Sequence, residues 1–211
     1  PVLYMHDGQN LFDDYFSYSG EWGVDESLDS LHARSGFGLI VVGIDNGSDK
    51  RMNEYSPWKN ERFGAPEGAA YADFVVQTLK PLVDKTYRTL PDPAHTGIMG
   101  SSMGGLISHY ALLRYPQTFT KGGIFSPSYW FSPEVFSFTT AERLPENARL
   151  YFRLGGQEGR EMERDLDKML AHLQKIGLPS SSVDSRLIPA GKHHESFWRR
   201  EFPDAVLWLF Q

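Results

Sequence analysis

The sequence of 211 residues contains no cysteine, which excludes disulfide bonds, thiolate metal sites and a cysteine nucleophile. It has no apolar run near the ~18 residues that a membrane-spanning helix needs. Lysine and arginine number 21 against 27 aspartates and glutamates, so the formal net charge is -6, and no basic cluster is longer than Arg199-Arg200. These absences argue against a membrane span and against nucleic acid as a partner.

The chain opens at Pro1 and enters the apolar run Val2 to Met5 without a leader. This start suggests a fragment or a trimmed chain, in which a signal peptide or earlier strands would be out of view. The cellular site is therefore left open, with a cytoplasmic site slightly favoured for a chain of soluble composition. The length fits one domain, residues 1–211.

Short apolar, β-rich runs alternate with longer stretches of helical period. The expected strands are residues 2–6, 38–44, 95–99, 122–125, 149–154 and 185–189. The expected helices are residues 24–34, 68–86, 103–115, 161–176 and 195–210, and Pro81 should end or kink the second of them. This alternation predicts an α/β fold with a mostly parallel central sheet covered by helices on both faces.

A nucleophile motif lies between a predicted strand and a predicted helix. Gly100-Ser101-Ser102-Met103-Gly104 fits the G-x-S-x-G pattern of the strand-to-helix turn that exposes a catalytic serine. A side chain at position 100 or 104 would crowd the neighbouring strand and helix, which explains the glycines. Of the two adjacent serines only Ser102 has glycine two residues away on both sides, so it is the predicted nucleophile.

A serine hydroxyl becomes an effective nucleophile when a histidine accepts its proton and an acid orients that histidine. His193 and His194 follow the last predicted strand, and either could serve on position alone. Glu158 follows the preceding strand at its carboxyl end, where open α/β sheets gather their sites. It is preferred over three carboxylates that lie on a helix or at the entry to a strand: Glu161, Asp165 and Asp184.

Ester cleavage passes through a tetrahedral oxyanion that backbone N–H groups must stabilise. Met103 follows the nucleophile and is the first predicted donor. Gln9 is favoured as the second, because it lies in the loop after the first strand and Gly8 permits a tight turn there. His6 and Asp7 have no spaced partner ligand and make a poor metal site. The sequence implies neither a metal nor a cofactor.

Seven segments carry a resemblance to a known family: Pro1 to Asp13, Gly20 to Asp25, Val42 to Asn46, Glu54 to Pro57, Gly100 to Gly105, Phe125 to Ser128, and Gly191 to His193 with Trp198. With these segments the whole chain resembles the putative esterase family of α/β hydrolases. That family includes enterochelin esterases, feruloyl and acetyl-xylan esterases, S-formylglutathione hydrolase and the mycolyltransferases.

The resemblance implies the α/β-hydrolase fold and selects between the two histidines. In the family the base precedes a tryptophan by five residues, and His193 has this relation to Trp198, so His194 is expected to be a neighbour that shapes the pocket. Family members begin with strands upstream of the segment that starts here at Pro1. This chain is therefore expected to lack the first strands of the sheet.

Together these residues predict a serine carboxylic-ester hydrolase that forms an acyl-enzyme with Ser102, His193 and Glu158. Two alternatives stay open: acyl transfer to an alcohol acceptor, and a non-catalytic binding domain. The expected partner is a small ester, aromatic or carbohydrate-linked, held by aromatic side chains of the loops above the sheet. The candidate contacts are Trp22, Tyr55, Trp58, Tyr129 and Trp130.

Overall fold

The computed structural model describes residues 1–211 and contains one six-stranded sheet in the order β2-β1-β3-β4-β5-β6. Every neighbouring pair of strands is parallel, and the strands overlap the six predicted ranges. The strands are β1 (Val2–His6), β2 (Ile40–Ile44), β3 (Thr96–Ser101), β4 (Lys121–Phe125), β5 (Arg149–Gly155) and β6 (Val183–Ile188). The predicted α/β class and parallel sheet are thus confirmed.

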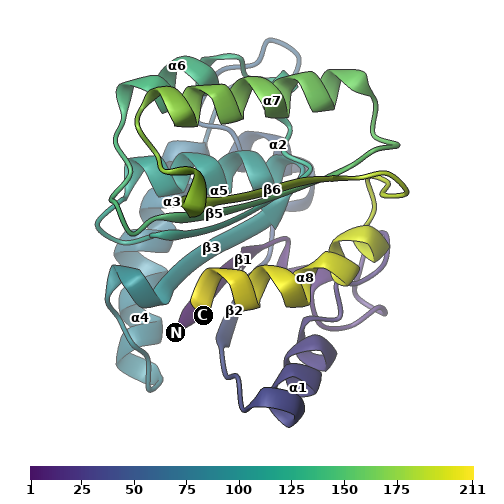
Figure 1. Cartoon of the computed structure of the whole chain (residues 1–211), viewed down its shortest axis with the longest axis vertical. Coiled ribbons are helices and arrows are strands. Elements are labelled where there is room, and N and C mark those ends of the chain that lie inside the picture. Colours follow the sequence, from purple (N-terminus) through teal and green to yellow (C-terminus); the bar gives the residue numbers. More distant parts are fainter.

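Helices connect or flank the strands (Figure 1). They are α1 (Val24–Ser35), α2 (Arg51–Glu54), α3 (Gly68–Phe74), α4 (Lys80–Thr86), α5 (Met103–Arg114), α6 (Glu134–Ala141), α7 (Arg160–Lys175) and α8 (Glu195–Phe210). The short helices α2 and α6 were not predicted from the sequence. None of these helices combines the length and the apolar character required to cross a membrane.

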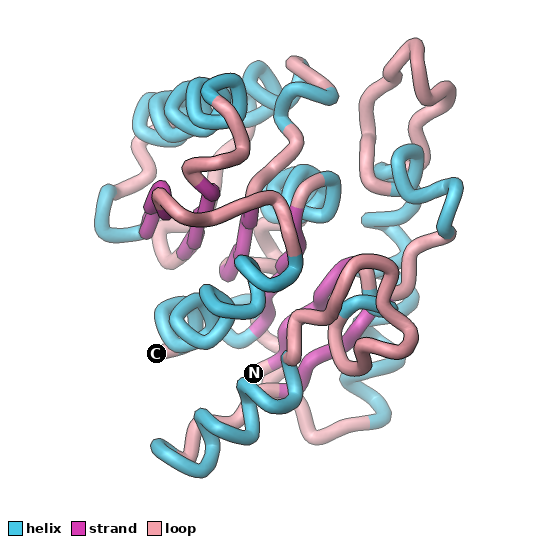
Figure 2. Tube along the Cα trace, turned by 90° about the vertical axis from the view of Figure 1, so that its right-hand side faces the viewer, coloured by secondary structure: helices cyan, strands magenta, loops and turns pink.

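The sheet separates two hydrophobic cores, one against each face. Side chains alternate along a strand, so Val2 and Tyr4 of β1 enter one core while Leu3 and Met5 enter the other. The first core contains side chains of α5, α6 and α7, and the second contains side chains of α1 and α8. Figures 1 and 2 show the sheet between these two layers of helices.

The interruption expected at Pro81 takes the form of a wide turn and not of a helix end. Helical conformation continues from α3 through a π-helical segment, Val75–Leu79, into α4. The N–H of Lys80 donates to the carbonyl of Val75, five residues back, and Pro81 is the second residue of α4. A π turn is one of the adjustments that accompany a proline, whose ring clashes with an ordinary preceding turn.

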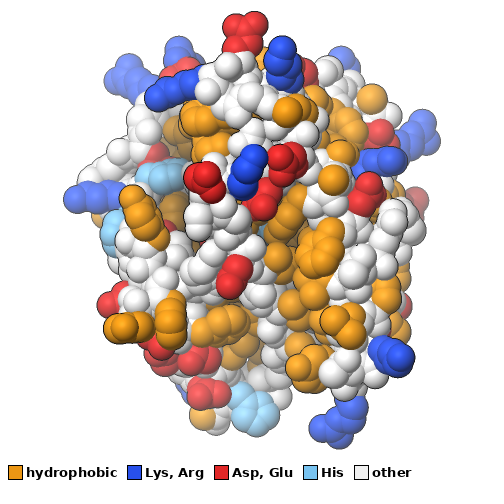
Figure 3. All heavy atoms as spheres, turned by 180° about the vertical axis from the view of Figure 1, so that it is seen from behind, with side chains coloured by type: hydrophobic (Ala, Val, Ile, Leu, Met, Phe, Trp, Pro, Cys, Tyr) orange, Lys and Arg blue, Asp and Glu red, His pale blue; other side chains and the backbone are white.

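Strand β2 forms one edge of the sheet, and its outer side carries exposed apolar surface. Leu82 and Tyr87 of the neighbouring helical segment are 59% and 60% exposed. Figure 3 shows hydrophobic side chains gathered on this face of the molecule. They border a groove of about 570 Å³ that is lined mainly by apolar residues: Ile40, Val41, Val42, Leu82, Val83, Thr86 and Tyr87.

Two buried histidines are expected to make the fold sensitive to acid. Burial lowers the pKa of His6 to about 4 and that of His109 to about 3. The unfolded chain binds both protons below a pH of about 6.5. The two neutral histidines should therefore contribute their full stability above that pH. The free energy of unfolding should fall as the pH drops towards 4, by at most about 1.4 kcal/mol per pH unit for each histidine.

Urea unfolding at several pH values between about 7 and about 4.5 measures this slope. His109→Leu should be less stable at neutral pH, because Tyr129 and Thr139 lose the imidazole that bonds both hydroxyls. Its stability should nevertheless depend less steeply on pH. An equal slope in the variant and the wild type would contradict this assignment.

Candidate active site

Ser102 occupies the turn between β3 and α5 with φ 59° and ψ -120°, a conformation that residues other than glycine rarely adopt. Its N–H donates to the carbonyl of Phe125 at 2.9 Å, and its carbonyl accepts from the N–H of Ser128 at 3.0 Å. A Cβ at Gly100 would lie 2.8 Å from the carbonyl carbon of Gly104. Glycine at position 100 thus allows the close strand–helix approach that exposes the Ser102 side chain.

Glu158 and His193 are joined by a 2.7 Å hydrogen bond between Oε2 and Nδ1. The Glu158 side chain is 1% exposed. Its Oε1 accepts from the N–H of Gly155 at 2.7 Å and from the hydroxyl of Ser126 at 2.6 Å. The indole of Trp198 donates to Ser126 Oγ at 2.9 Å and lies edge-on to the His193 ring. This network fixes the carboxylate and, through it, the orientation of the imidazole.

The rival residues do not take part in this network. His194 points to the start of α8, where its Nδ1 accepts from the N–H of Ser196 at 3.1 Å and caps the helix. Asp184 pairs with the buried Arg153 at 2.7 Å. Glu161 and Asp165 both lie on α7. The structure therefore brings His193, and none of the other candidates, to Glu158.

Ser102 and His193 line one cavity of about 700 Å³ but are not hydrogen bonded to each other. The Ser102 hydroxyl instead bonds Ser128 Oγ at 3.2 Å. Catalytic hydrogen bonds are often long in a protein without substrate and tighten in the complex. Ser128 was not among the predicted site residues, although it lies in the segment 125–128 that contributed to the family resemblance.

One predicted oxyanion donor, Met103, directly follows the nucleophile, and the other, Gln9, lines the cavity. Met103 is the buried first residue of α5, and the first N–H groups of a helix have no partner within the helix. Gln9 lines the cavity from a single 3-10 turn after β1. Its side-chain amide donates to the carbonyl of Asn46 at 2.9 Å and accepts from the N–H of Asn46 at 3.1 Å. These two bonds join the loop after β1 to the loop after β2.

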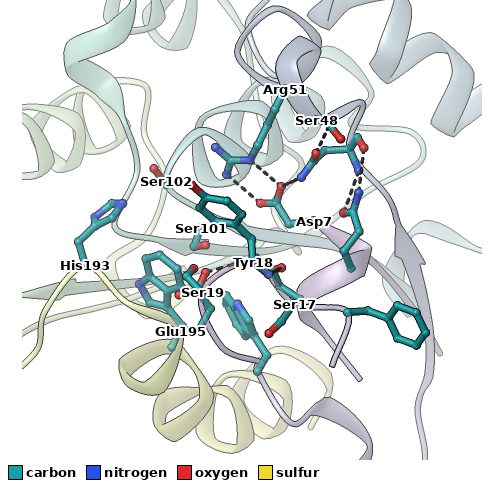
Figure 4. Close-up of a pocket in the computed structure, with 16 residues that line it drawn as sticks. Asp7, Ser17, Tyr18, Ser19, Ser48, Arg51, Ser101, Ser102, His193 and Glu195 are labelled. Carbon is teal, nitrogen blue, oxygen red and sulfur yellow. Dashed lines mark hydrogen bonds and ion pairs between the residues drawn. The ribbon is translucent and has the colours of Figure 1, made fainter. Parts of the chain in front are cut away.

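One of the five aromatic residues proposed for substrate contact lines the cavity. Trp22 does so with only 3% of its surface exposed, packed between the rings of Phe125 and Trp198. The structure adds Phe16 and Tyr18, which were not among the predicted contacts. They are 69% and 96% exposed, and Figure 4 draws Tyr18 among the residues that line the cavity.

The other four proposed contacts lie away from the cavity. Tyr55 is fully buried, and its hydroxyl accepts from the N–H of Asp7 at 3.0 Å. Trp58 packs edge-on against aromatic rings of the core. Tyr129 is buried, and its hydroxyl is hydrogen bonded to the buried His109. Trp130 is 48% exposed and packs edge-on against Phe131. Sequence position above the sheet was therefore not enough to place these side chains at the site.

The chain matches the family model described as "Putative esterase" over residues 1–209. It is 28% identical over 225 residues to the uncharacterized protein YbbA of Bacillus subtilis, covering the whole chain and 85% of that protein. It is 25% identical to the iron(III) salmochelin esterase of Escherichia coli, covering 97% of the chain and 49% of that protein.

Solved structures share the fold. The enterobactin esterase FES from Shigella flexneri superposes on the whole chain with a TM-score of 0.80 at 23% identity, and the chain covers 52% of it. A ferulic acid esterase gives a TM-score of 0.72 at 16% identity, with 84% of that chain covered. The chain thus spans about half the length of the salmochelin and enterobactin esterases.

The family match and the esterases among the relatives support an esterase activity for this chain. The parallel sheet, the strained serine turn after β3 and the superposition on solved esterases agree with that match. The chain therefore belongs to the Putative esterase family and has the α/β-hydrolase fold of its members.

Proposed function

We propose that this chain is a serine carboxylic-ester hydrolase that works through an acyl-enzyme intermediate. The observation that carries the proposal is the 2.7 Å hydrogen bond from His193 to the buried Glu158, made by a histidine that lines the same cavity as Ser102. A nucleophile on a strained turn, a base beside it and a carboxylate that orients the base form the arrangement used by serine hydrolases.

In the first half-reaction Ser102 Oγ bonds to the ester carbonyl carbon while His193 Nε2 takes the hydroxyl proton. Glu158 accepts from the Nδ1–H of the imidazole and stabilises the positive charge that forms there. When the tetrahedral intermediate collapses, the C–O bond to the alcohol breaks and His193 returns the proton to the leaving oxygen. Water then attacks the acyl-enzyme by the same route and releases the carboxylic acid and free Ser102.

The negative oxygen of each tetrahedral intermediate needs fixed donors. We assign this role to the backbone N–H groups of Gln9 and Met103. The positive end of the α5 dipole lies at Met103 and favours a negative charge at the same point. The bond between Ser102 and Ser128 must break so that the hydroxyl can turn to His193.

The cavity suits a small ester substrate with an aromatic or a hydroxyl-rich part. Phe16, Tyr18 and Trp22 offer ring faces and edges, and most of the remaining lining is polar. Relatives named for salmochelin, enterobactin and ferulic acid esters support an aromatic or carbohydrate-linked substrate. Acyl transfer to an alcohol would use the same acyl-enzyme, and no feature of the cavity favours it over hydrolysis.

Ser102→Ala should lower turnover of p-nitrophenyl acetate and methyl ferulate by at least about 10³-fold, because the covalent intermediate cannot form. The fold should be unchanged by circular dichroism. Ser101→Ala, at the adjacent serine, is the matched control and should retain most of the activity. Near-wild-type rates for Ser102→Ala, or an equal loss for Ser101→Ala, would refute the choice of nucleophile.

The two neighbouring histidines provide a second comparison. His193→Ala should lose about 10³-fold or more in kcat, because no other group accepts the Ser102 proton. His194→Ala should keep kcat within a few-fold but lose about 1 kcal/mol of stability, since it removes the cap of α8. Steady-state kinetics and urea unfolding of both variants separate the roles, and a reversed pattern would show that His194 is the base.

A further inference from the structure

The cavity contains a carboxylate that the proposed ester cleavage does not use. Glu195, the first residue of α8, lines the cavity together with Ser102 and His193, although only 7% of its surface is exposed. Its Oε1 accepts from the side-chain amide of Asn10 at 3.3 Å. Its Oε2 has no partner in the protein and is not sealed from solvent.

A carboxylate offers about four lone-pair positions to hydrogen-bond donors. Asn10 occupies only one of those on Glu195, and with a long bond. Most of the accepting capacity of this nearly buried group is therefore free for a molecule in the cavity. A nearly buried carboxylate with a single long hydrogen bond is incompletely satisfied, so a ligand that supplies a further donor would gain free energy there.

The other fixed charges of the cavity cancel. Arg51 holds Asp7 through two bonds, Nε to Oδ1 at 2.6 Å and Nη2 to Oδ2 at 2.8 Å, so this pair contributes no net charge. His193 must be neutral to act as a base. Glu195 is then the only charged residue of the lining without an ion pair, and the lining carries a formal charge of -1 (Asp7 -1, Arg51 +1, Glu195 -1). Figure 4 shows Arg51 and Glu195 on opposite sides of the Ser101-Ser102 turn.

The carboxylate is also held in place. Asn10, which donates to Glu195, accepts at Oδ1 from the N–H of Tyr18 at 3.0 Å. The helix N-terminus at Glu195 favours a negative charge in this position. These contacts tie the loop that carries Tyr18 to α8 and keep the carboxylate and the aromatic ring at the same cavity.

We propose that Glu195 is a specificity residue: it selects esters that carry a hydrogen-bond donor or a positive charge, such as a hydroxyl or an ammonium group, beside the scissile bond. Such a group gains a charge-assisted bond or an ion pair with the carboxylate. An anionic group would instead meet an uncompensated like charge in a cavity partly shielded from water. The inference rests on the proposed esterase function and adds the class of substrate.

Two pairs of acetate esters test this selectivity, because the members of each pair have nearly the same shape. In the first pair 2-hydroxyethyl acetate carries a hydroxyl where propyl acetate carries a methyl. In the second, acetylcholine carries a cation where 3,3-dimethylbutyl acetate carries a neutral carbon. The ratio of kcat/KM within each pair is measured for wild type, Glu195→Gln and Glu161→Gln. Gln at 195 keeps an acceptor for Asn10. It removes the charge and replaces the unpartnered acceptor by an NH2 donor.

Glu161→Gln is the matched control, because Glu161 is an exposed acid in the first turn of α7 that does not line the cavity and bonds none of its residues. Wild type should prefer the hydroxyl or cationic member. Glu195→Gln should lower at least one ratio by about 5- to 30-fold, the difference between a bond to a charged and to a neutral acceptor. The pair whose ratio changes shows whether Glu195 recognises a hydroxyl or an ammonium group of the substrate.

Unchanged ratios in Glu195→Gln, no preference in wild type, or an equal change in Glu161→Gln would overturn the inference. If wild type cleaves neither these four esters nor p-nitrophenyl acetate and methyl ferulate, the proposed function fails separately. In that case the selectivity is measured as the difference in binding affinity between two probes, choline and 3,3-dimethylbutan-1-ol. Each probe is titrated into Ser102→Ala protein, and binding is followed by the NMR signals of the Trp22 and Trp198 indoles. Choline should bind more tightly, and Glu195→Gln should remove the difference; equal binding of the two probes would overturn the inference.

Discussion

The conformation of Ser102 is the constraint on which the site depends. A serine at φ 59° and ψ -120° costs on the order of 1–3 kcal/mol of backbone strain. Such a conformation persists only where the surrounding structure enforces it. Bonds to Phe125 at the end of β4 and to Ser128 in the loop after it enforce this conformation, and the N–H of Leu106 in α5 donates to the Ser102 carbonyl at 3.1 Å. Every residue of α5 except Arg114 is buried, so the helix cannot shift to relieve the turn.

The parallel sheet explains how residues distant in sequence meet at this turn. The carboxyl ends of parallel strands lie on one edge, and the loops that leave them converge there. Gln9 follows β1, Ser102 follows β3, Ser128 follows β4, Glu158 follows β5 and His193 follows β6. These five strands are consecutive neighbours in the sheet, in the order β1-β3-β4-β5-β6, so their loops form one continuous row. The cavity and its charged groups are built on that row.

The strained turn at Ser102 and the contact between Glu158 and His193 were predictable from the sequence, because their signals are local. The glycine spacing around Ser102 reports a strand-to-helix turn, and the positions of Glu158 and His193 after successive strands require only the strand order. The contacts of Ser128 were not readable, because its bond to Ser102 joins loops 26 residues apart. Likewise the exposure of Tyr18 and the burial of Tyr55 depend on packing between distant segments, which no local pattern records.

The elements of the fold also divide into those that the local sequence predicts and those that depend on packing between distant segments. Strands and long helices follow from hydrophobic period, and the structure reproduces all of them. The π turn before Pro81 and the short helix α6 arise from tertiary packing that overrides local preference. The role inferred for Glu195 belongs to this second group, since only the assembled cavity reveals that Asp7 and Arg51 pair with each other while Glu195 bonds only the neutral Asn10.

The central claim is that Ser102 is a nucleophile activated at this site, and covalent labelling tests it most directly. A fluorophosphonate is attacked by an activated serine and leaves a stable phosphonyl adduct whose oxygen occupies the oxyanion position. Incubation of the folded protein followed by peptide mass spectrometry should find one adduct, on Ser102, and none after unfolding. An adduct on another serine, or no adduct on the folded protein, would contradict the assignment.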